Sequence, residues 1–412
     1  MKKIAIICQR YGLEVNGGAE YHARILAEQL SARYNVQVLT TTALDYRGWS
    51  NHYPAGEEIV NDVPVKRFPT LKLSAKKTRK ARRAILKKKK YFKILRFLGL
   101  YNFFDRKFKI SDVKHKDIVN WVAGQGPYCP DLVRYLKLNK EAYDVFIFFT
   151  YLYYPTVVGM PLVKEKAIFI PTAHDEPPLY TKPYEDLFAV PRFIMYNTAS
   201  EKKLIESNFK HYTEENDIAG VGIVSNSEPG TGQIDSKYNY DFDYFIYIGR
   251  IDANKGCKEL VKFFDKYSLN KKIKLVLVGK DFMDLKVSGN IIKTGFVSEK
   301  EKLHLLRNSS GLIIPSKYES LSMVTLEAML EGKTVIVNGQ CEVLKEHIIN
   351  SDAGFYYENY NDFEKCLNSV LGMSPEDQKK LAEKSVAYVE QNYSWESILN
   401  RFDKAVRFIT EK

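Results

Sequence analysis

The sequence predicts an α/β protein of two units, each a parallel β-sheet covered by helices. Three observations support this prediction. The 412 residues exceed what one ordinary hydrophobic core needs. Short apolar runs alternate with segments of helical periodicity in two successive series. A turn-rich stretch, NSEPGTGQ at 226–233, separates the two series.

The first series predicts a unit over residues 1–225. Its continuous apolar runs are typical of strands buried on both faces, and a helix with Ala and Leu at helical spacing follows the first of them. The expected strands are 4–8, 36–41, 145–149, 167–170 and 193–196, and the expected helix is 17–33.

The second series follows a predicted linker at 226–240 and predicts a unit over 241–392. A last amphipathic helix at 393–412 is expected to pack back on the first unit. The expected strands are 245–249, 275–279, 291–297, 312–315 and 334–337, and the expected helices are 256–267, 299–307 and 323–331. Two such units would bind a ligand in a cleft outside the carboxyl ends of their strands.

Composition narrows the class of protein. The five cysteines are odd in number and contain no C-x-x-C, which argues against a disulfide scaffold or a zinc cluster and favours a reducing, cytoplasmic compartment. The apolar run at 4–8 is too short for a signal peptide, so we interpret it as a buried strand. No apolar run reaches the roughly 18 residues of a membrane-spanning helix.

The positive charge is concentrated in one segment. Residues 72–96 contain thirteen Lys and Arg and no Asp or Glu, which is more than the whole net charge of +12, so the rest of the chain is close to neutral. Such a distribution indicates a local function rather than a generally basic protein.

Two acids in PSKYESLSMVTLEAM, at 315–329, are the first candidate site. Glu319 precedes a predicted helix and Glu327 lies inside it, and eight helical residues span about 12 Å. The acids would therefore contact different parts of one extended ligand rather than act as a close acid–base pair. The N–H groups at the helix start suit a phosphate. Alone, the two acids could equally be a surface residue and a helix-stabilising one.

Two further loops carry candidate residues at strand ends. In YIGRIDANKG, Gly249 permits close backbone approach, and Arg250 and Lys255 could meet an anion on the loop that follows the strand. In the NGGAE stretch at 16–20, Gly17 and Gly18 precede a helix and could present N–H groups to a phosphate or sugar. This second stretch is not G-x-G-x-x-G, so a dinucleotide fingerprint is not supported.

Together these motifs resemble the retaining glycosyltransferases of family four, which have the GT-B fold and an E-x7-E motif. The resemblance covers nearly the whole chain in organisation. It is strongest over 244–357, which contains YIGRIDANKG, LVLVGK, TGFVSEKEK, PSKYESLSMVTLEAM, GKTVIVNGQ and AGFYY in family order. It implies two Rossmann-like domains whose parallel sheets face each other across a cleft.

The resemblance also implies roles for individual residues. Arg250 and Lys255 would bind the donor diphosphate, Glu327 the ribose hydroxyls and Glu319 the transferred sugar. The other implied donor contacts are Gly17 and Gly18 at the diphosphate, Phe296 and Val297 at the base, Leu321, Ser322, Met323 and Val324 at sugar and phosphate, and His174 in IPTAHDEP as the active-site histidine. Many relatives have Gly at the position of Ser322.

The resemblance implies a donor of the UDP- or GDP-sugar type and no metal or other cofactor. Negative charge grows on the leaving diphosphate, and cations and helix starts would stabilise it. The acceptor would attack from the face that the nucleotide leaves, so no side-chain nucleophile is expected. Asp241 and Asp243 match D-x-D formally, but we interpret them as solvated loop acids.

The basic segment continues into the aromatic stretch YFKILRFLGLYNFF at 91–104. This pattern favours an interfacial helix on an anionic membrane surface, formed by residues from Lys72 to Phe104 in an insert at about 72–116. A solvated loop and a nucleic-acid contact are the alternatives, and we expect no nucleic acid. The resemblance places the acceptor in the first unit, which contains this insert, so the acceptor would be a glycan or a polyprenyl-linked glycan at the inner face of the cell membrane.

Other functions stay open at this stage. A sugar-nucleotide epimerase on the same fold would need additional acid–base residues, and a phosphorylase would need a much longer chain. A non-catalytic membrane- or nucleic-acid-binding protein on the same scaffold is the alternative from another class. Retention of Arg250, Lys255 and both acids argues against it.

Overall fold

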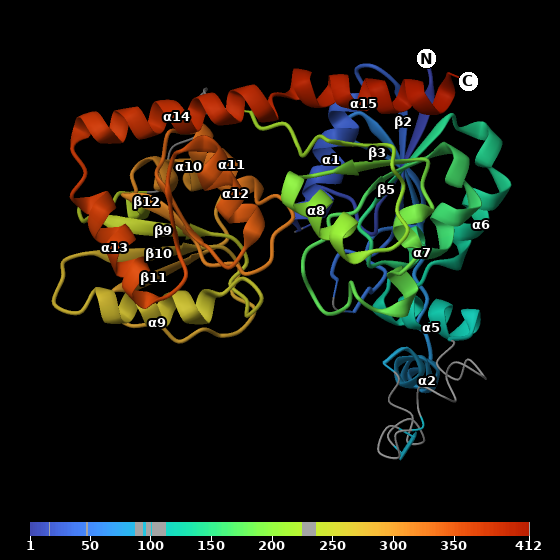
Figure 1. Cartoon of the computed structure of the whole chain (residues 1–412), viewed down its shortest axis with the longest axis horizontal. Coiled ribbons are helices and arrows are strands. Elements are labelled where there is room, and N and C mark those ends of the chain that lie inside the picture. Colours follow the sequence, from blue (N-terminus) through green and yellow to red (C-terminus); the bar gives the residue numbers. More distant parts are fainter. Residues whose placement is uncertain are drawn as a thin grey trace. The chain divides into compact units, whose positions relative to one another are not determined.

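The computed structural model describes residues 1–15, 17–46, 48–86, 94–95, 100, 113–224 and 236–411. The described chain divides into two compact units, one of residues 1–219 with 399–412 and the other of residues 220–398. Each is an α/β unit built on its own sheet, which confirms the predicted fold class (Figure 1).

The first sheet has eight strands in the order β3-β4-β2-β1-β5-β6-β7-β8. Neighbouring strands are parallel except β3 and β4, which form an antiparallel hairpin that the sequence analysis did not predict. The strands are β1 (Lys3–Ile7), β2 (Asn35–Thr41), β3 (Gly56–Val60), β4 (Val63–Phe68), β5 (Val145–Phe149), β6 (Ala167–Ile170), β7 (Phe193–Tyr196) and β8 (Asn216–Ile218).

Helices cover this first sheet. Aromatic side chains from β5, β6 and the helices dominate the core on one of its faces. The α-helices are α1 (Gly18–Leu30), α2 (Ala75–Ile85), α5 (His115–Gln125), α6 (Pro130–Leu138), α7 (Tyr154–Gly159) and α8 (Ala199–Asn208). The last helix, α15 (Trp395–Thr410), joins this unit from Leu399 onward.

The second sheet has six parallel strands in the order β11-β10-β9-β12-β13-β14. Helices α9 and α13 pack together against one face, while α10, α11 and α12 lie on the other (Figure 1). The strands are β9 (Tyr244–Ile248), β10 (Lys274–Val278), β11 (Ile291–Gly295), β12 (Gly311–Ile314), β13 (Val335–Asn338) and β14 (Phe355–Tyr357). The helices are α9 (Cys257–Tyr267), α10 (Glu299–Arg307), α11 (Met323–Leu330), α12 (Glu342–Ser351), α13 (Tyr360–Leu371) and α14 (Pro375–Tyr393).

In each sheet, the order in which successive strands are added changes direction at one place. In the first sheet, β2 is added on one side of β1, and β5 and β6 are added on the other. In the second sheet, β10 and β11 are added on one side of β9, and β12 to β14 are added on the other. In open α/β sheets ligands bind beyond the carboxyl ends of strands at such a switch point. The loops after β9 and β12 are those that carry the motifs of the sequence analysis.

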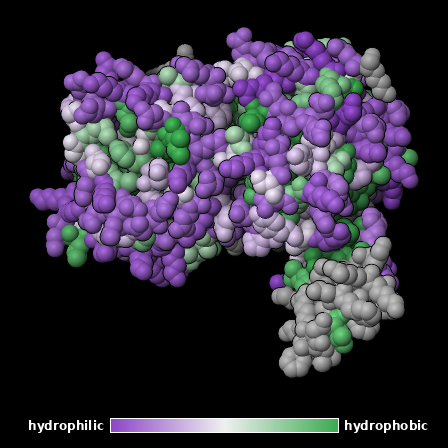
Figure 2. Space-filling view, in the orientation of Figure 1, coloured by the Kyte–Doolittle hydropathy of each residue, from purple (hydrophilic) through white to green (hydrophobic). Residues whose placement is uncertain are grey.

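Hydrophilic residues cover most of the surface in the face shown in Figure 2. Within the described residues, no helix is both long enough and apolar enough to cross a membrane.

Candidate active site

The loops after β9 and β12 meet at the switch point of the second sheet. Lys255 Nζ lies 2.5 Å from Glu319 Oε1, although the two residues are 64 positions apart. Gly256 makes this approach possible, because it has φ +72° and a Cβ there would lie 2.3 Å from the carbonyl oxygen of Pro315. The sheet order therefore brings together two residues that the sequence analysis selected separately.

Asp252 organises the loop that carries the two predicted cations. It is buried, its Oδ1 accepts a hydrogen bond from the Lys255 N–H at 3.0 Å, and its Oδ2 lies 3.6 Å from Arg250 Nε. Asp252 was not among the residues selected from the sequence. Its place between the two cations in RIDANK is the signal that could have identified it.

The loop from β12 ends at Ser322, one residue before α11. Ser322 has φ +63° and ψ +71°, the left-handed conformation that glycine adopts without strain. Its hydroxyl and that of Thr325 share a hydrogen bond of 2.9 Å. Since α11 begins at Met323, the N–H groups of Met323 and Val324 belong to a first helical turn, where no carbonyl four residues earlier in the helix is available.

A buried histidine supports this loop from below. His347 Nε2 donates to the carbonyl oxygen of Leu321 at 2.7 Å, and the Tyr388 hydroxyl lies 3.0 Å from His347 Nδ1. Burial lowers the pKa of His347, so the ring is neutral near pH 7 and Nδ1 accepts from Tyr388. His347 lies within α12 and belongs to no recognised sequence motif, so it could not be selected from the sequence.

Glu327 faces a different cation from Glu319. Its Oε2 lies 2.9 Å from Lys302 Nζ, and Lys302 also contacts Glu299 at 2.6 Å. Burial alone would lower the pKa of Lys302, but the carboxylates of Glu327 and Glu299 raise it above its usual range. Glu319 and Glu327 thus contact different lysines.

The residues expected to contact the nucleotide base, Phe296 and Val297, directly follow β11. Gly295 has φ +76°, and the following Phe296 is 76% exposed while Val297 is buried. Ser298 then caps α10 through a capping box with Glu301. Lys302, on the second turn of this helix, connects the same loop to Glu327.

The first unit holds the remaining predicted residues at the carboxyl ends of its own strands. Gly17 caps α1 and Gly18 begins it, while Asn16 of the same motif lies outside the described residues. A Cβ at Gly17 would lie 2.1 Å from Glu20 Oε2. Glu20 forms a buried ion pair with Arg10 at 2.5 Å, which the sequence analysis did not predict.

His174 lies on the loop after β6, with Nε2 3.3 Å from Glu176 Oε1. The Tyr151 hydroxyl donates to the same oxygen at 2.5 Å. Burial alone would raise the pKa of Glu176, but the hydrogen bonds from His174 and Tyr151 lower it. Glu176 therefore holds an ionised carboxylate beside the histidine.

Glu201 fixes the backbone next to His174. Its buried carboxylate accepts hydrogen bonds from the N–H groups of Ala173 at 2.5 Å and Asn197 at 2.6 Å. Burial raises the pKa of Glu201 to about 8, and the two backbone hydrogen bonds oppose that rise. Neither Glu176 nor Glu201 was among the residues selected from the sequence.

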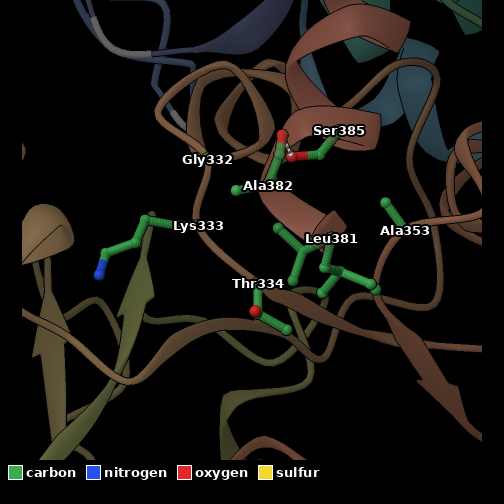
Figure 3. Close-up of a pocket in the computed structure, with 9 residues that line it drawn as sticks. Gly332, Lys333, Thr334, Ala353, Leu381, Ala382 and Ser385 are labelled. Atoms are coloured by element: carbon green, nitrogen blue, oxygen red, sulfur yellow. Dashed lines mark hydrogen bonds between the residues drawn. The ribbon is translucent and has the colours of Figure 1, made fainter. Parts of the chain in front are cut away.

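A separate small hollow lies in the second unit between the start of β13 and α14 (Figure 3). The Lys333 side chain points away from the other labelled side chains, and Ser385 Oγ donates to the Ala382 and Met329 carbonyls. Among the described residues that line it, none was selected as a site residue.

The described residues contain no group of three or more His, Cys, Asp or Glu placed to hold a metal ion. Asp241 and Asp243 of the D-x-D stretch are both exposed on the loop before β9.

The chain is similar to known proteins in sequence and in fold. Residues 234–387 match the family model of the glycosyl transferases group 1. The matched segment contains Arg250, Lys255, Glu319 and Glu327.

One curated relative is the lipopolysaccharide 1,2-N-acetylglucosaminetransferase of Salmonella typhimurium, which is 24% identical over 186 residues, 40% of this chain and 49% of the relative. The chain spans about half the length of the curated relatives it matches.

Two solved structures are similar over nearly the whole chain. Sucrose-phosphate synthase from Thermosynechococcus elongatus has a TM-score of 0.68 at 15% identity and covers 99% of this chain and 98% of its own. HepE of Anabaena, in complex with UDP and glucose, has a TM-score of 0.67 at 13% identity, with 98% and 99% covered. The two Rossmann-like units of this chain have the GT-B fold of these structures.

Proposed function

We propose that this protein is a retaining glycosyltransferase. It transfers a hexose from a UDP- or GDP-sugar to a glycan or lipid-linked glycan in cell-surface polysaccharide biosynthesis. The observation that carries the proposal is the cluster of Arg250, Lys255 and Glu319 beside the start of α11, at the switch point of the second sheet. The match to glycosyl transferases group 1 and the UDP and glucose bound to HepE support it.

The cluster can bind a diphosphate and stabilise its departure. Arg250 and Lys255 are cations on one loop, and the first-turn N–H groups of α11 add donors for an anion. Charge that develops on the leaving oxygen would be stabilised by groups already in position. Glu319 pairs with Lys255 in the free protein, and it would release this lysine to the phosphate while accepting a hydrogen bond from a sugar hydroxyl.

The other proposed donor contacts lie on Glu327, on the loop after β11 and in the first unit. Glu327, held by Lys302, would accept hydrogen bonds from the ribose hydroxyls, and the loop at Phe296 and Val297 would contact the base. His174 and the Gly17–Gly18 turn would contribute from the first unit. The acceptor would attack from the face that the diphosphate leaves, and a diphosphate oxygen would take its proton, so the reaction needs neither a side-chain nucleophile nor a metal.

We also propose a cytoplasmic protein that binds the inner face of the cell membrane through its basic segment, and binds no nucleic acid. Helix α2 buries Ala81, Ala84 and Ile85 and exposes six cations, and Ser74 caps its start. The exposed cations are Lys76, Lys77, Arg79, Lys80, Arg82 and Arg83. Most of the aromatic stretch at 91–104 lies outside the described residues.

A binding panel tests the donor assignment. The purified chain is titrated with UDP-, GDP-, ADP- and dTDP-sugars by calorimetry, and nucleoside diphosphate release is then measured with the sugar that binds. We expect Glu327→Gln to weaken binding of the free nucleoside diphosphate at least tenfold. Glu319→Gln should instead leave that affinity within about twofold and reduce release.

Glu299→Gln is the matched control. Glu299 is an exposed residue that also contacts Lys302, but it is assigned no ligand contact. Its nucleotide affinity should stay close to that of the wild type. Binding of no nucleotide sugar by the wild type, or an unchanged affinity in Glu327→Gln, would contradict the proposal.

A further inference from the structure

Two aromatic side chains meet at the carboxyl edge of the first sheet. Trp49 follows β2 and Tyr153 follows β5, and their ring centroids lie 5.2 Å apart at an interplanar angle of 77°. Both side chains are half-buried. Because β2, β1 and β5 are parallel neighbours, these loops end at the same sheet edge as the Gly17–Gly18 turn.

Trp49 is held in a strained conformation. Its φ is +50°, in the left-handed region that a bulky residue rarely adopts. Two hydrogen bonds fix it there. The Thr70 hydroxyl donates to the Trp49 carbonyl at 2.5 Å, and the indole Nε1 donates to the Gln125 carbonyl at 3.0 Å. Gly126 leaves room for the ring, since a Cβ there would lie 2.2 Å from Nε1.

Packing alone does not account for this arrangement. Trp121, on the neighbouring helix α5, is a packing residue and is only 8% exposed, whereas Trp49 is half-buried. Backbone strain that is retained at a partly exposed side chain is characteristic of ligand sites, where it keeps a side chain in one orientation. The indole N–H is already satisfied within the protein, so the ring face is the part that can contact a ligand.

One short loop of the first unit connects the aromatic pair to His174. Tyr153 lies two residues after Tyr151, whose hydroxyl donates to Glu176, and Glu176 in turn contacts His174. Thr150, at the start of this loop, also has a positive φ of +62°. A ligand on Trp49 and Tyr153 would therefore lie along the loop that adjoins the histidine.

We propose that Trp49 and Tyr153 form an acceptor subsite that stacks on a sugar ring. A pyranose presents a face of C–H groups with hydroxyls at its rim, and a fixed aromatic face covers the first while leaving the second in water. The inference rests on the proposed function and deepens it, because it assigns a glycan rather than a bare lipid as the group that the first unit recognises.

The test measures binding of simple glycosides to the full chain, without a donor. Saturation-transfer NMR is run with methyl α- and β-glycosides of glucose, galactose, mannose, rhamnose, N-acetylglucosamine and N-acetylgalactosamine. We expect at least one glycoside to bind the wild type. Its affinity should fall at least tenfold in Trp49→Asn, in which the new residue tolerates the positive φ, and in Tyr153→Leu.

Trp121→Phe is the control, because it changes a buried ring of the same unit and should leave glycoside affinity within about twofold. Trp49→Phe should retain much of the affinity, since it keeps an aromatic face. Binding of none of the glycosides, or equal binding in the wild type and both loss variants, would overturn the inference. So would loss, in the same variants, of binding to vesicles that contain polyprenyl phosphate without a sugar.

The outcome is separable from that of the donor experiment. Glycoside binding that depends on Trp49, in a chain that binds no nucleotide sugar, would support the subsite and contradict the transferase. Donor binding with no role for Trp49 would do the reverse.

Discussion

At the scale of single residues, the candidate site depends on side chains whose conformations only their neighbours explain. Ser322 adopts a left-handed backbone where glycine would be unstrained, and its hydroxyl shares a hydrogen bond with Thr325. The cost of a left-handed conformation for a residue with a Cβ is about 1–2 kcal/mol. The hydrogen bond offsets part of that cost, at about 1 kcal/mol.

We therefore expect an unusual order of stability at this position. Ser322→Gly should be more stable than Ser322→Ala by about 1 kcal/mol, because both variants lose the hydrogen bond but alanine keeps the backbone strain that glycine relieves. Urea unfolding measures the difference. Ser369, exposed within α13, is the control: there glycine should be less stable than alanine by about 1 kcal/mol. The same order at both positions would be inconsistent with a strained Ser322.

At the scale of elements, α12 and α14 set the position of the loop before α11. His347 of α12 donates to the Leu321 carbonyl and accepts from Tyr388 of α14. A glutamine amide nitrogen can occupy the place of Nε2, whereas that of asparagine is too short to reach the carbonyl. We therefore expect the loop to keep its position in a variant that preserves this donor and to shift in one that removes it.

His347→Asn should accordingly lower the free energy of unfolding by about 1–3 kcal/mol, since it leaves a buried carbonyl without its donor, and His347→Gln should lower it less. Nucleoside diphosphate affinity should decline in the same order. Tyr388→Phe, which removes only the hydroxyl, is the matched control and should resemble His347→Gln. Equal loss in the Gln and Asn variants would show that this hydrogen bond has no part in holding the loop.

The same histidine predicts a pH dependence. Burial lowers the pKa of His347, so below about pH 6.5 the unfolded chain takes up a proton there that the folded chain does not. Stability should therefore fall as the pH decreases from 6.5. The slope between pH 6.5 and 5 should be smaller in His347→Gln.

At the scale of the whole molecule, the chain leaves the first unit at Ala219 and rejoins it at Leu399. Asp403 of α15 then contacts Arg33 and Tyr34, which follow α1. Its carboxylate accepts from the Tyr34 hydroxyl at 2.6 Å and pairs with Arg33 at 2.5 Å. The last residues of the chain are thus part of the first folded unit.

Asp403→Ala should destabilise the first unit by about 1 kcal/mol, because it removes a hydrogen bond and a half-buried ion pair. Lys404→Ala, its exposed neighbour on the same helix, should change stability by less than about 0.5 kcal/mol. Calorimetric unfolding of both variants measures the difference. Equal effects would place α15 outside the structure that stabilises this unit.

The basic helix predicts how the molecule interacts with membranes. Reversing the charge of Lys76 and Lys80 should reduce binding to vesicles of anionic lipid at least tenfold, since each cation near such a surface contributes about 1 kcal/mol. Flotation with and without anionic lipid measures it. Reversal of Lys262 and Lys272, exposed cations of the second unit, is the control. Failure of the wild type to bind either vesicle would remove the membrane proposal, and tight binding to duplex DNA would favour the nucleic-acid alternative.

Much of the fold could be predicted because local patterns encode it. The apolar runs and helical periodicities correspond to β1, β2, β5–β7 and β9–β13 and to α1 and α9–α11, with ends that differ by a few residues. The β3–β4 hairpin was missed because its strands mix charged and apolar residues at an exposed sheet edge. The candidate residues on the loops after β9 and β12 could be selected because each motif is contiguous along the chain.

The sequence by itself determined the two α/β units and the motifs that end their strands, since both depend on residues close together along the chain. Only the tertiary structure decided which charges meet. The pairs Lys255–Glu319 and Lys302–Glu327, and the support of Leu321 by His347, join residues 25 to 64 positions apart. Their contacts depend on the order of strands in a sheet, which no local pattern specifies.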